Sequence, residues 1–122
     1  MNETVEIMVL GASSKQGRYS YLAVRRLIAK GYKVIAVGKT GGEIDGVPVL
    51  SSIPEDAHPQ TVLMYLAPEN QSEYLETLIK IKPWFVIFSP GTEFPEFEDE
   101  LRKHGIQVME NCALIMMSLD KL

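Results

Sequence analysis

The chain has 122 residues, of which 46% are hydrophobic and 23% are charged, and these values are ordinary for one globular domain. Its single cysteine, Cys112, excludes an internal disulfide, and no apolar stretch approaches the roughly 20 residues that a membrane helix needs. The net charge of −4 argues against a nucleic-acid binder, and the first residues lack the pattern of an export signal. We expect one domain, 1–122, in the cytoplasm.

The charge is unevenly distributed along the chain. Residues 1–40 hold seven basic and two acidic side chains, a net of +5, whereas the remainder holds five basic and fourteen acidic ones, a net of −9. An acidic protein with a basic first third favours a local anion site over a track for a polyanion. The alternative is a helix with a basic solvent face, which accounts for Arg25, Arg26 and Lys30 better than for Lys15, Arg18 and Lys39.

The N-terminal half of the chain predicts two buried strands around one helix. Thr4–Leu10 is almost continuously apolar, as in a strand covered on both faces. Apolar residues at helical spacing predict a helix over Tyr19–Lys30, which Gly31 would end. Lys33–Val37 is a second buried strand. A short strand fits 47–50, and 51–60, with its two prolines, reads as a loop.

The C-terminal half continues the alternation of strands and helices. The predicted elements are a strand over Thr61–Leu66, a helix from Pro68 to about Lys80, a strand over Trp84–Phe88, a helix over Pro95–His104 ended by Gly105, a strand over Ile106–Met109 and a helix over Ala113–Leu119. The pattern predicts an α/β fold with a mostly parallel sheet of about five strands and helices on both faces. Ligands bind such folds at the carboxyl ends of the strands.

The loop after the first strand, Gly11–Ser20, has the composition of a phosphate-binding turn. Gly11 permits a tight turn and Gly17 permits close approach of a ligand, although their spacing differs from that of a dinucleotide-binding turn. Serine hydroxyls and two cations supply donors and charge, and Ser20 is a candidate N-cap for the helix that follows. The alternative is a purely structural turn. The residues concerned are Ser13, Ser14, Lys15, Arg18 and Ser20.

The end of the second strand carries Lys39 where an NAD-binding domain usually has an acidic residue for the ribose. A lysine suits an additional phosphate, so NADP with its 2′-phosphate or coenzyme A (CoA) with its 3′-phosphate fits better than NAD. The alternative is a solvated turn lysine.

Catalytic candidates are few. His58 lies in a proline-flanked loop and His104 at a helix end, where a cation complements the dipole, so both are interpreted as structural or surface residues. Cys112 follows a strand and is interpreted as a small buried residue, with a nucleophile as the alternative. We find no metal-ligand spacing. Met116 and Met117 suit either core packing or a contact between copies of the chain.

Several motifs together resemble one family. They are Gly11-Ala-Ser13 with Ser20, Gly31-Tyr-Lys-Val-Ile-Ala-Val37, Gly41-Gly-Glu-Ile-Asp-Gly46, Ser51 with Ser52, Pro68-Glu69 and a late Cys112. In these the chain resembles the small stand-alone CoA-binding proteins, which are similar to the CoA-binding domain of the succinyl-CoA synthetase alpha subunit. The resemblance covers essentially the whole chain and implies a single three-layer Rossmann-like domain that binds CoA. Because no catalytic constellation stands out, we expect binding of CoA or an acyl-CoA without catalysis.

The resemblance also implies a set of binding residues, with the ADP part over the first loop and Lys39 and with Pro68 along the adenine or pantetheine path. The full expected set is Gly11, Ala12, Ser13, Lys15, Arg18, Ser20, Lys39 and Pro68. The chain departs from the family's usual residues at four places, which are Gly38-Lys39, Leu66-Ala67, Phe88-Ser89-Pro90-Gly91 and Asn111-Cys112-Ala113. Two alternatives therefore stay open, an NADP-linked or acyl-handling enzyme and a regulatory subunit with a decayed nucleotide pocket.

Overall fold

The computed structural model describes residues 5–122, so Thr4 of the first predicted strand lies outside the described residues. Over this range the strands form one seven-stranded sheet in the order β3-β4-β2-β1-β5-β6-β7. Neighbours are parallel except for the antiparallel pair β3 and β4. The strands are β1 (Glu6–Leu10), β2 (Lys33–Val37), β3 (Glu43–Ile44), β4 (Val47–Leu50), β5 (Thr61–Met64), β6 (Phe85–Phe88) and β7 (Gln107–Glu110).

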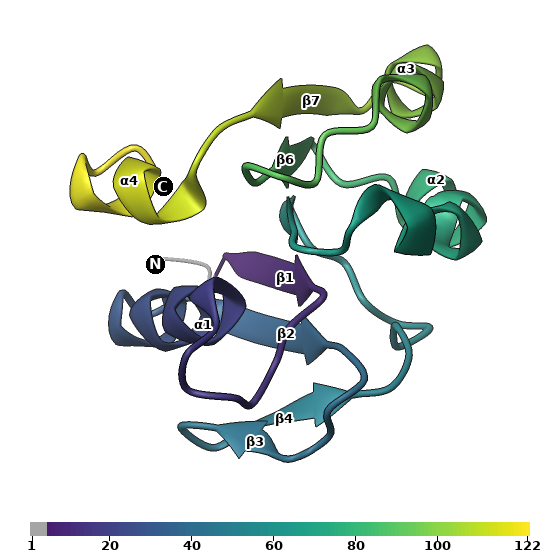
Figure 1. The fold of residues 1–122 in the computed structure, drawn as a ribbon. Helices are drawn as coiled ribbons and strands as arrows, with labels where there is room; N and C mark the ends of the chain where they lie inside the picture. The colour runs from purple at the N-terminus through teal and green to yellow at the C-terminus, as the bar shows by residue number, and fades with distance from the viewer. Residues whose placement is uncertain (1–4) are drawn as a thin grey trace.

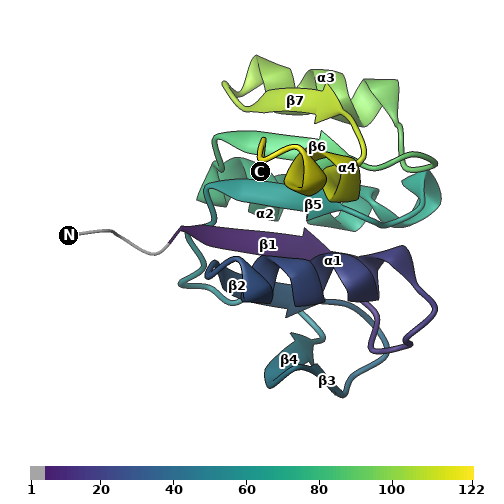
Figure 2. The ribbon, with the colours of Figure 1, turned by 90° about the vertical axis from the view of Figure 1, so that its left-hand side faces the viewer.

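Helices cover both faces of this sheet, as predicted. They are α1 (Tyr19–Ala29), α2 (Leu75–Ile81), α3 (Pro95–Lys103) and α4 (Ala113–Ser118). Figure 1 looks along the layers and shows α1 and α4 on one side of the sheet, with α2 and α3 on the other. In Figure 2 the helices α1 and α4 lie in front of the sheet and the arrowheads of β1, β6 and β7 point to one common edge. Within residues 5–122, no helix is long and apolar enough to cross a membrane.

The core is split between the two faces because successive residues of a strand point to opposite sides. In β1, Ile7 and Val9 pack with α1 and α4, whereas Met8 and Leu10 pack with α2 and α3. All four are buried. A strand covered on both faces therefore reads as an unbroken apolar run, which is the pattern that predicted it.

The strand count is higher than the predicted five. The additional strands are β4, which matches the short strand expected over 47–50, and the two-residue β3, which pairs with it as a hairpin. The return from β4 to β5 contains no helix. Instead Ala57, in the predicted loop, is buried in the same core cluster as Val37, on the face of the sheet opposite α1.

The predicted helix from Pro68 to about Lys80 is wrong in its first half. Two 3₁₀ turns, Pro68–Asn70 and Ser72–Tyr74, precede α2. Gln71 lies between them with a fully buried side chain, whose Nε2 donates hydrogen bonds to the carbonyls of Leu66 (2.9 Å) and Thr92 (2.7 Å). These hydrogen bonds hold the Gln71 side chain inside the protein. The chain therefore makes two 3₁₀ turns in place of a regular helix starting at Pro68.

Candidate functional site

The strand order reverses between β1 and β5, and the loop that leaves β1 is tightly held at this point. Gly11 has a φ of +96°, and an added Cβ would lie 2.8 Å from the backbone of Tyr65 and Leu66. The N–H groups of Gly11 and Ala12 both donate to the carbonyl of Val37, at 2.8 Å each. A glycine is therefore required here, because the loop is wedged between the ends of β2 and β5.

The loop that leaves β2 packs directly on the loop that leaves β1. An added Cβ at Gly38 would collide with the carbonyl oxygen of Ala12. Beyond this contact, the Thr40 hydroxyl accepts hydrogen bonds from the N–H (3.0 Å) and the hydroxyl (3.1 Å) of Ser14. By contrast, Gly17 has open space around it, so no contact within the described part of the chain requires a glycine there.

The start of α1 differs from the prediction. The helix begins at Tyr19, with an extended Arg18 as its N-cap, so Ser20 is the second helical residue and the prediction of Ser20 as N-cap is wrong. Arg18 takes that place because its N–H donates to the carbonyl of Lys15, so the N-cap lies two residues before the predicted one. Within residues 5–122 no side chain caps this helix, so its first N–H groups, at the positive end of the helix dipole, have no side-chain partner.

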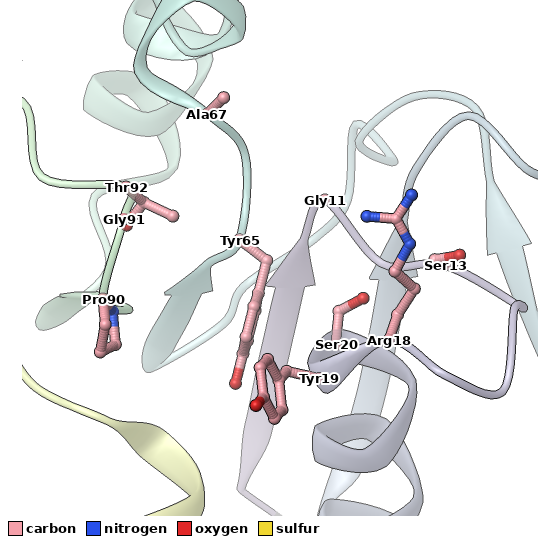
Figure 3. A pocket seen from close by; sticks show the side chains of 10 residues that line it. All are labelled: Gly11, Ser13, Arg18, Tyr19, Ser20, Tyr65, Ala67, Pro90, Gly91 and Thr92. Atoms are coloured by element: carbon pink, nitrogen blue, oxygen red, sulfur yellow. The ribbon is translucent and has the colours of Figure 1, made fainter.

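A cavity of about 300 Å³ opens between the loops that leave β1, β5 and β6. Its walls are Gly11, Ser13, Arg18, Tyr19 and Ser20 from the first loop and helix, Tyr65 and Ala67 after β5, and Pro90, Gly91 and Thr92 after β6. Figure 3 shows Tyr65 standing between the β1 loop and the turn at Pro90. The cavity lies at the reversal of strand order, the place where open α/β sheets bind ligands.

Two further cavities extend this one in opposite directions. One, of about 170 Å³, shares Gly11, Ser13 and Arg18 with the first cavity and reaches Lys15 and Lys39. The other, of about 370 Å³, shares Tyr19, Tyr65 and Pro90 with it; the residues that complete this wall are Ser89, Cys112, Leu114 and Ile115. The three together form a groove along the strand ends, with a cationic end at Lys39 and an apolar end at α4.

The three cations of the groove have no carboxylate partner in the described part of the chain. Among residues 5–122, Lys15, Arg18 and Lys39 form no ion pair, whereas Arg25 pairs with Asp45 at 3.0 Å and Lys30 with Asp120 at 3.5 Å. Arg25 and Lys30 thus belong to the outer surface of α1. The groove cations are available for an anion, and a phosphate can accept several hydrogen bonds from them.

Tyr65 divides the groove, and its environment is largely apolar. Burial raises the pKa of the Tyr65 phenol, and the nearby Ser89 hydroxyl opposes that rise. The two hydroxyls are neighbours, yet the Ser89 Oγ makes no hydrogen bond with ordinary geometry. Tyr65 therefore stays a neutral phenol at the boundary between the polar and apolar cavities.

The structure brings most predicted binding residues together. Gly11, Ser13, Arg18 and Ser20 line the first cavity, and Ala12, Lys15 and Lys39 line the cationic one. Pro68 begins a 3₁₀ turn directly after Ala67, which lines the first cavity in its place. The expectation missed Tyr19, Tyr65 and Thr40. Their position close to the predicted strand ends could have identified them as site residues. It also missed Gln71, whose side chain forms a brace, that is, hydrogen bonds that link the loops after β5 and β6.

The residues considered for chemistry lie in different surroundings. The N–H of His58 donates to a carboxylate oxygen of Glu6 (2.7 Å), and the Nδ1 of His104 lies 2.9 Å from the carbonyl of Glu100. Neither histidine lines the groove cavities. Cys112 lies at the N-cap position of α4 and contributes to the apolar cavity; it is half-buried, so its interpretation as a buried residue is wrong. Met117 is buried in the core, whereas Ile115 of α4 and Leu119, which follows the helix, are exposed.

The parallel sheet with helices on both faces defines the class of this protein as a Rossmann-like α/β domain. The model of the CoA binding domain family matches residues 5–118, and the chain belongs to that family. The predicted family and fold class are thus confirmed.

Solved structures with the same fold include the crystal structure of an uncharacterized protein, 36% identical, with a TM-score of 0.92 and coverage of 99% of this chain and 100% of that one. A protein from Thermus thermophilus is 25% identical, with a TM-score of 0.84 and coverage of 98% and 91%. A hypothetical protein from Pyrococcus horikoshii OT3, 24% identical with a TM-score of 0.84 and coverage of 93% and 81%, shares the fold. A comparison with curated proteins finds no match.

Proposed function

We propose that this chain binds CoA in the groove along its strand ends and does not itself catalyse a reaction. The observation that carries the proposal is that, within residues 5–122, three cations without ion pairs, Lys15, Arg18 and Lys39, line the two adjoining cavities at the reversal of strand order, one of which includes the uncapped start of α1. Membership of the CoA binding domain family supports the identity of the ligand. The polar-to-apolar course of the groove supports it too, because CoA has a phosphate-rich end and an apolar end.

The proposal gives each part of the ligand a place. The pyrophosphate would lie against Ser13, Arg18 and the first N–H groups of α1, where the dipole favours negative charge. The 3′-phosphate would lie near Lys39, with Lys15 adding charge. Pantetheine would then pass Gly11 and Tyr65 toward the turn after β6. A contact of Pro68 with the ligand stays a prediction. Its neighbour Ala67 forms the wall of the groove at this place.

The groove residues support binding rather than catalysis. The walls of the groove offer hydroxyls, cations and apolar groups. Cys112 supplies the one thiol, and neither histidine of the chain lines these walls. A nucleophile needs a base within hydrogen-bond reach, and the cavity walls do not supply a histidine for that role.

Calorimetric titration and thermal unfolding with CoA, dephospho-CoA, NADP and NAD test the proposal. CoA is expected to bind most tightly and to raise the melting temperature, since a ligand at one hundred times its Kd stabilises a protein by about 2.7 kcal/mol. A response to NADP and none to CoA would instead support the enzyme alternative. No response to millimolar CoA contradicts the proposal and favours a regulatory subunit with a decayed pocket.

A further inference from the structure

The apolar cavity at the far end of the groove contains one polar group that the fold does not use. Ser89, at the end of β6, is 5% exposed, and its Oγ makes no hydrogen bond of ordinary geometry within residues 5–122, although the Tyr65 hydroxyl lies beside it. A buried hydroxyl without a partner is unfavourable, so such a group in a native protein calls for an explanation. Because Ser89 lines the cavity, a ligand atom there could meet this need.

The backbone of Ser89 shows that its hydroxyl is not required by the turn. Its N–H donates to the carbonyl of Met64 at 3.3 Å. Its carbonyl accepts from the N–H of Thr92 at 3.0 Å and from the Thr92 hydroxyl at 2.7 Å. Thr92 therefore closes the turn, and an alanine at position 89 would make the same backbone contacts. The hydroxyl is left to serve something other than the fold.

The remaining walls define the chemistry that this cavity accepts. Leu114, Ile115 and Pro90 offer apolar surface, and no lysine or arginine is among the lining residues. A carboxylate placed here would lose its hydration without gaining a cation, which is strongly unfavourable. A neutral carbonyl followed by a short aliphatic chain suits the site, since the carbonyl can accept from Ser89 and the chain can bury apolar area.

We propose that this cavity, formed by Tyr65, Ser89, Cys112, Leu114 and Ile115, is the acyl subsite for short, uncharged acyl-CoA thioesters. The Ser89 hydroxyl donates a hydrogen bond to the thioester carbonyl oxygen, and the acyl chain packs on Leu114 and Ile115. The inference rests on the proposed binding of CoA in the adjoining cavity, which shares Tyr65 with this one. It predicts that the protein prefers an aliphatic acyl-CoA to free CoA and to an acyl-CoA that ends in a carboxylate.

Titration of the full chain with CoA, butyryl-CoA and succinyl-CoA tests the preference directly. Butyryl-CoA is expected to bind about tenfold more tightly than CoA, because the added methylenes become buried. Succinyl-CoA is expected to bind no better than CoA, because its carboxylate finds no cation. If butyryl-CoA and CoA bind equally, or if succinyl-CoA equals butyryl-CoA, the acyl subsite is wrong while CoA binding stands. If no ligand binds, the proposed function fails as well.

Variants then assign the role of the hydroxyl. Ser89→Ala is expected to weaken butyryl-CoA about fivefold and to leave CoA within about twofold, as for the loss of one hydrogen bond. Without ligand, its melting temperature should change little, because the removed hydroxyl makes no hydrogen bond of ordinary geometry within the described residues and has only the Tyr65 hydroxyl beside it. Ser52→Ala, in an exposed loop, is the matched control. A clear loss of stability in Ser89→Ala, or unchanged affinity for butyryl-CoA, overturns the assignment.

A second variant tests the cavity without changing the hydroxyl. Ile115 is 56% exposed, so a larger side chain is tolerated there by the fold and can still enter the cavity that Ile115 lines. Ile115→Trp is expected to abolish the preference for butyryl-CoA while CoA continues to bind. Retention of the full preference in this variant contradicts the location of the acyl group.

Discussion

The two halves of the sheet, which meet where β1 pairs with β5, offer different chemistry to the groove. The half formed by β1 and β2 brings cations and hydroxyls on two loops that are fixed by backbone contacts, as at Gly38 and Ala12. The half formed by β5, β6 and β7 brings apolar walls and the buried hydroxyl of Ser89. One half is suited to charge, and the other to shape and to neutral hydrogen bonding.

The largest expected effect comes from breaking the loop contact in the first half. Gly38→Ala places a Cβ against the carbonyl of Ala12, where only backbone movement can relieve the collision. We expect a loss of about 3 kcal/mol in the free energy of unfolding, at the upper end of overpacking effects. Urea denaturation measures it. Gly17→Ala, which meets open space, is the control and should stay within about 0.5 kcal/mol of the wild type.

The next effect tests the brace in the second half. Gln71→Ala leaves the carbonyls of Leu66 and Thr92 without their shared donor. The expected cost is about 2 kcal/mol, reduced from the sum of two buried hydrogen bonds because the Oε1 of Gln71 is itself unpartnered. Gln107→Ala, at an exposed position of β7, should cost far less in the same denaturation experiment. Equal costs would mean that the brace does not hold the two loops together.

A smaller effect tests the charge of the first half. Lys39→Ala is expected to weaken CoA about fivefold and dephospho-CoA hardly at all, since only CoA carries the 3′-phosphate. Calorimetric titration of both ligands gives the ratio. Lys80→Ala, an exposed lysine near the end of α2, serves as the control for net charge. Equal weakening of both ligands would place Lys39 away from that phosphate.

The smallest effect concerns Glu98, which is 2% exposed. Burial raises the pKa of its carboxyl; the N–H of Phe94 opposes the rise, Glu110 adds to it, and Arg102 opposes it. Because the folded pKa lies above the unfolded one, the folded state binds the proton more tightly, and stability falls as pH rises from the unfolded to the folded pKa.

Glu98→Gln should remove this fall and leave stability flat over the same window, a change of about 1 kcal/mol or less. Its side-chain oxygen can still accept from the N–H of Phe94, as Glu98 does at 2.8 Å. Denaturation at a series of pH values measures the profile. Glu96→Gln, exposed on the same helix, should keep the wild-type profile. A fall that persists in Glu98→Gln would assign it to another group.

The alternation of strands and helices was predictable because burial on both faces makes each central strand a continuous apolar run, as in β1. The failures came from contacts that sequence spacing does not contain. Gln71 interrupts the second helix through hydrogen bonds to Leu66 and Thr92, and the latter is 21 residues away. The N-cap error at Ser20 amounts to two positions, within the usual uncertainty of helix ends.

For the groove, position was predictable and side-chain environment was not. Gly11, Arg18 and Lys39 follow strands, and the parallel sheet necessarily brings strand ends to one edge. Ser89 also follows a strand, but its unpartnered hydroxyl depends on how Thr92 closes the turn. The role of Tyr65 likewise depends on which residues surround it after folding.

The reversal of strand order has a mechanical consequence. The two halves of the sheet are joined edge to edge only through the β1–β5 ladder, which pairs Ile7–Leu10 with Thr61–Met64. The groove crosses the end of this ladder, with Gly11 after β1 on one side and Tyr65 after β5 on the other. A ligand that contacts both halves of the sheet links them across the β1–β5 ladder. Separation of β1 from β5 therefore also breaks the ligand's contacts with one half. Amide exchange along β1 and β5 would then slow in step with ligand occupancy.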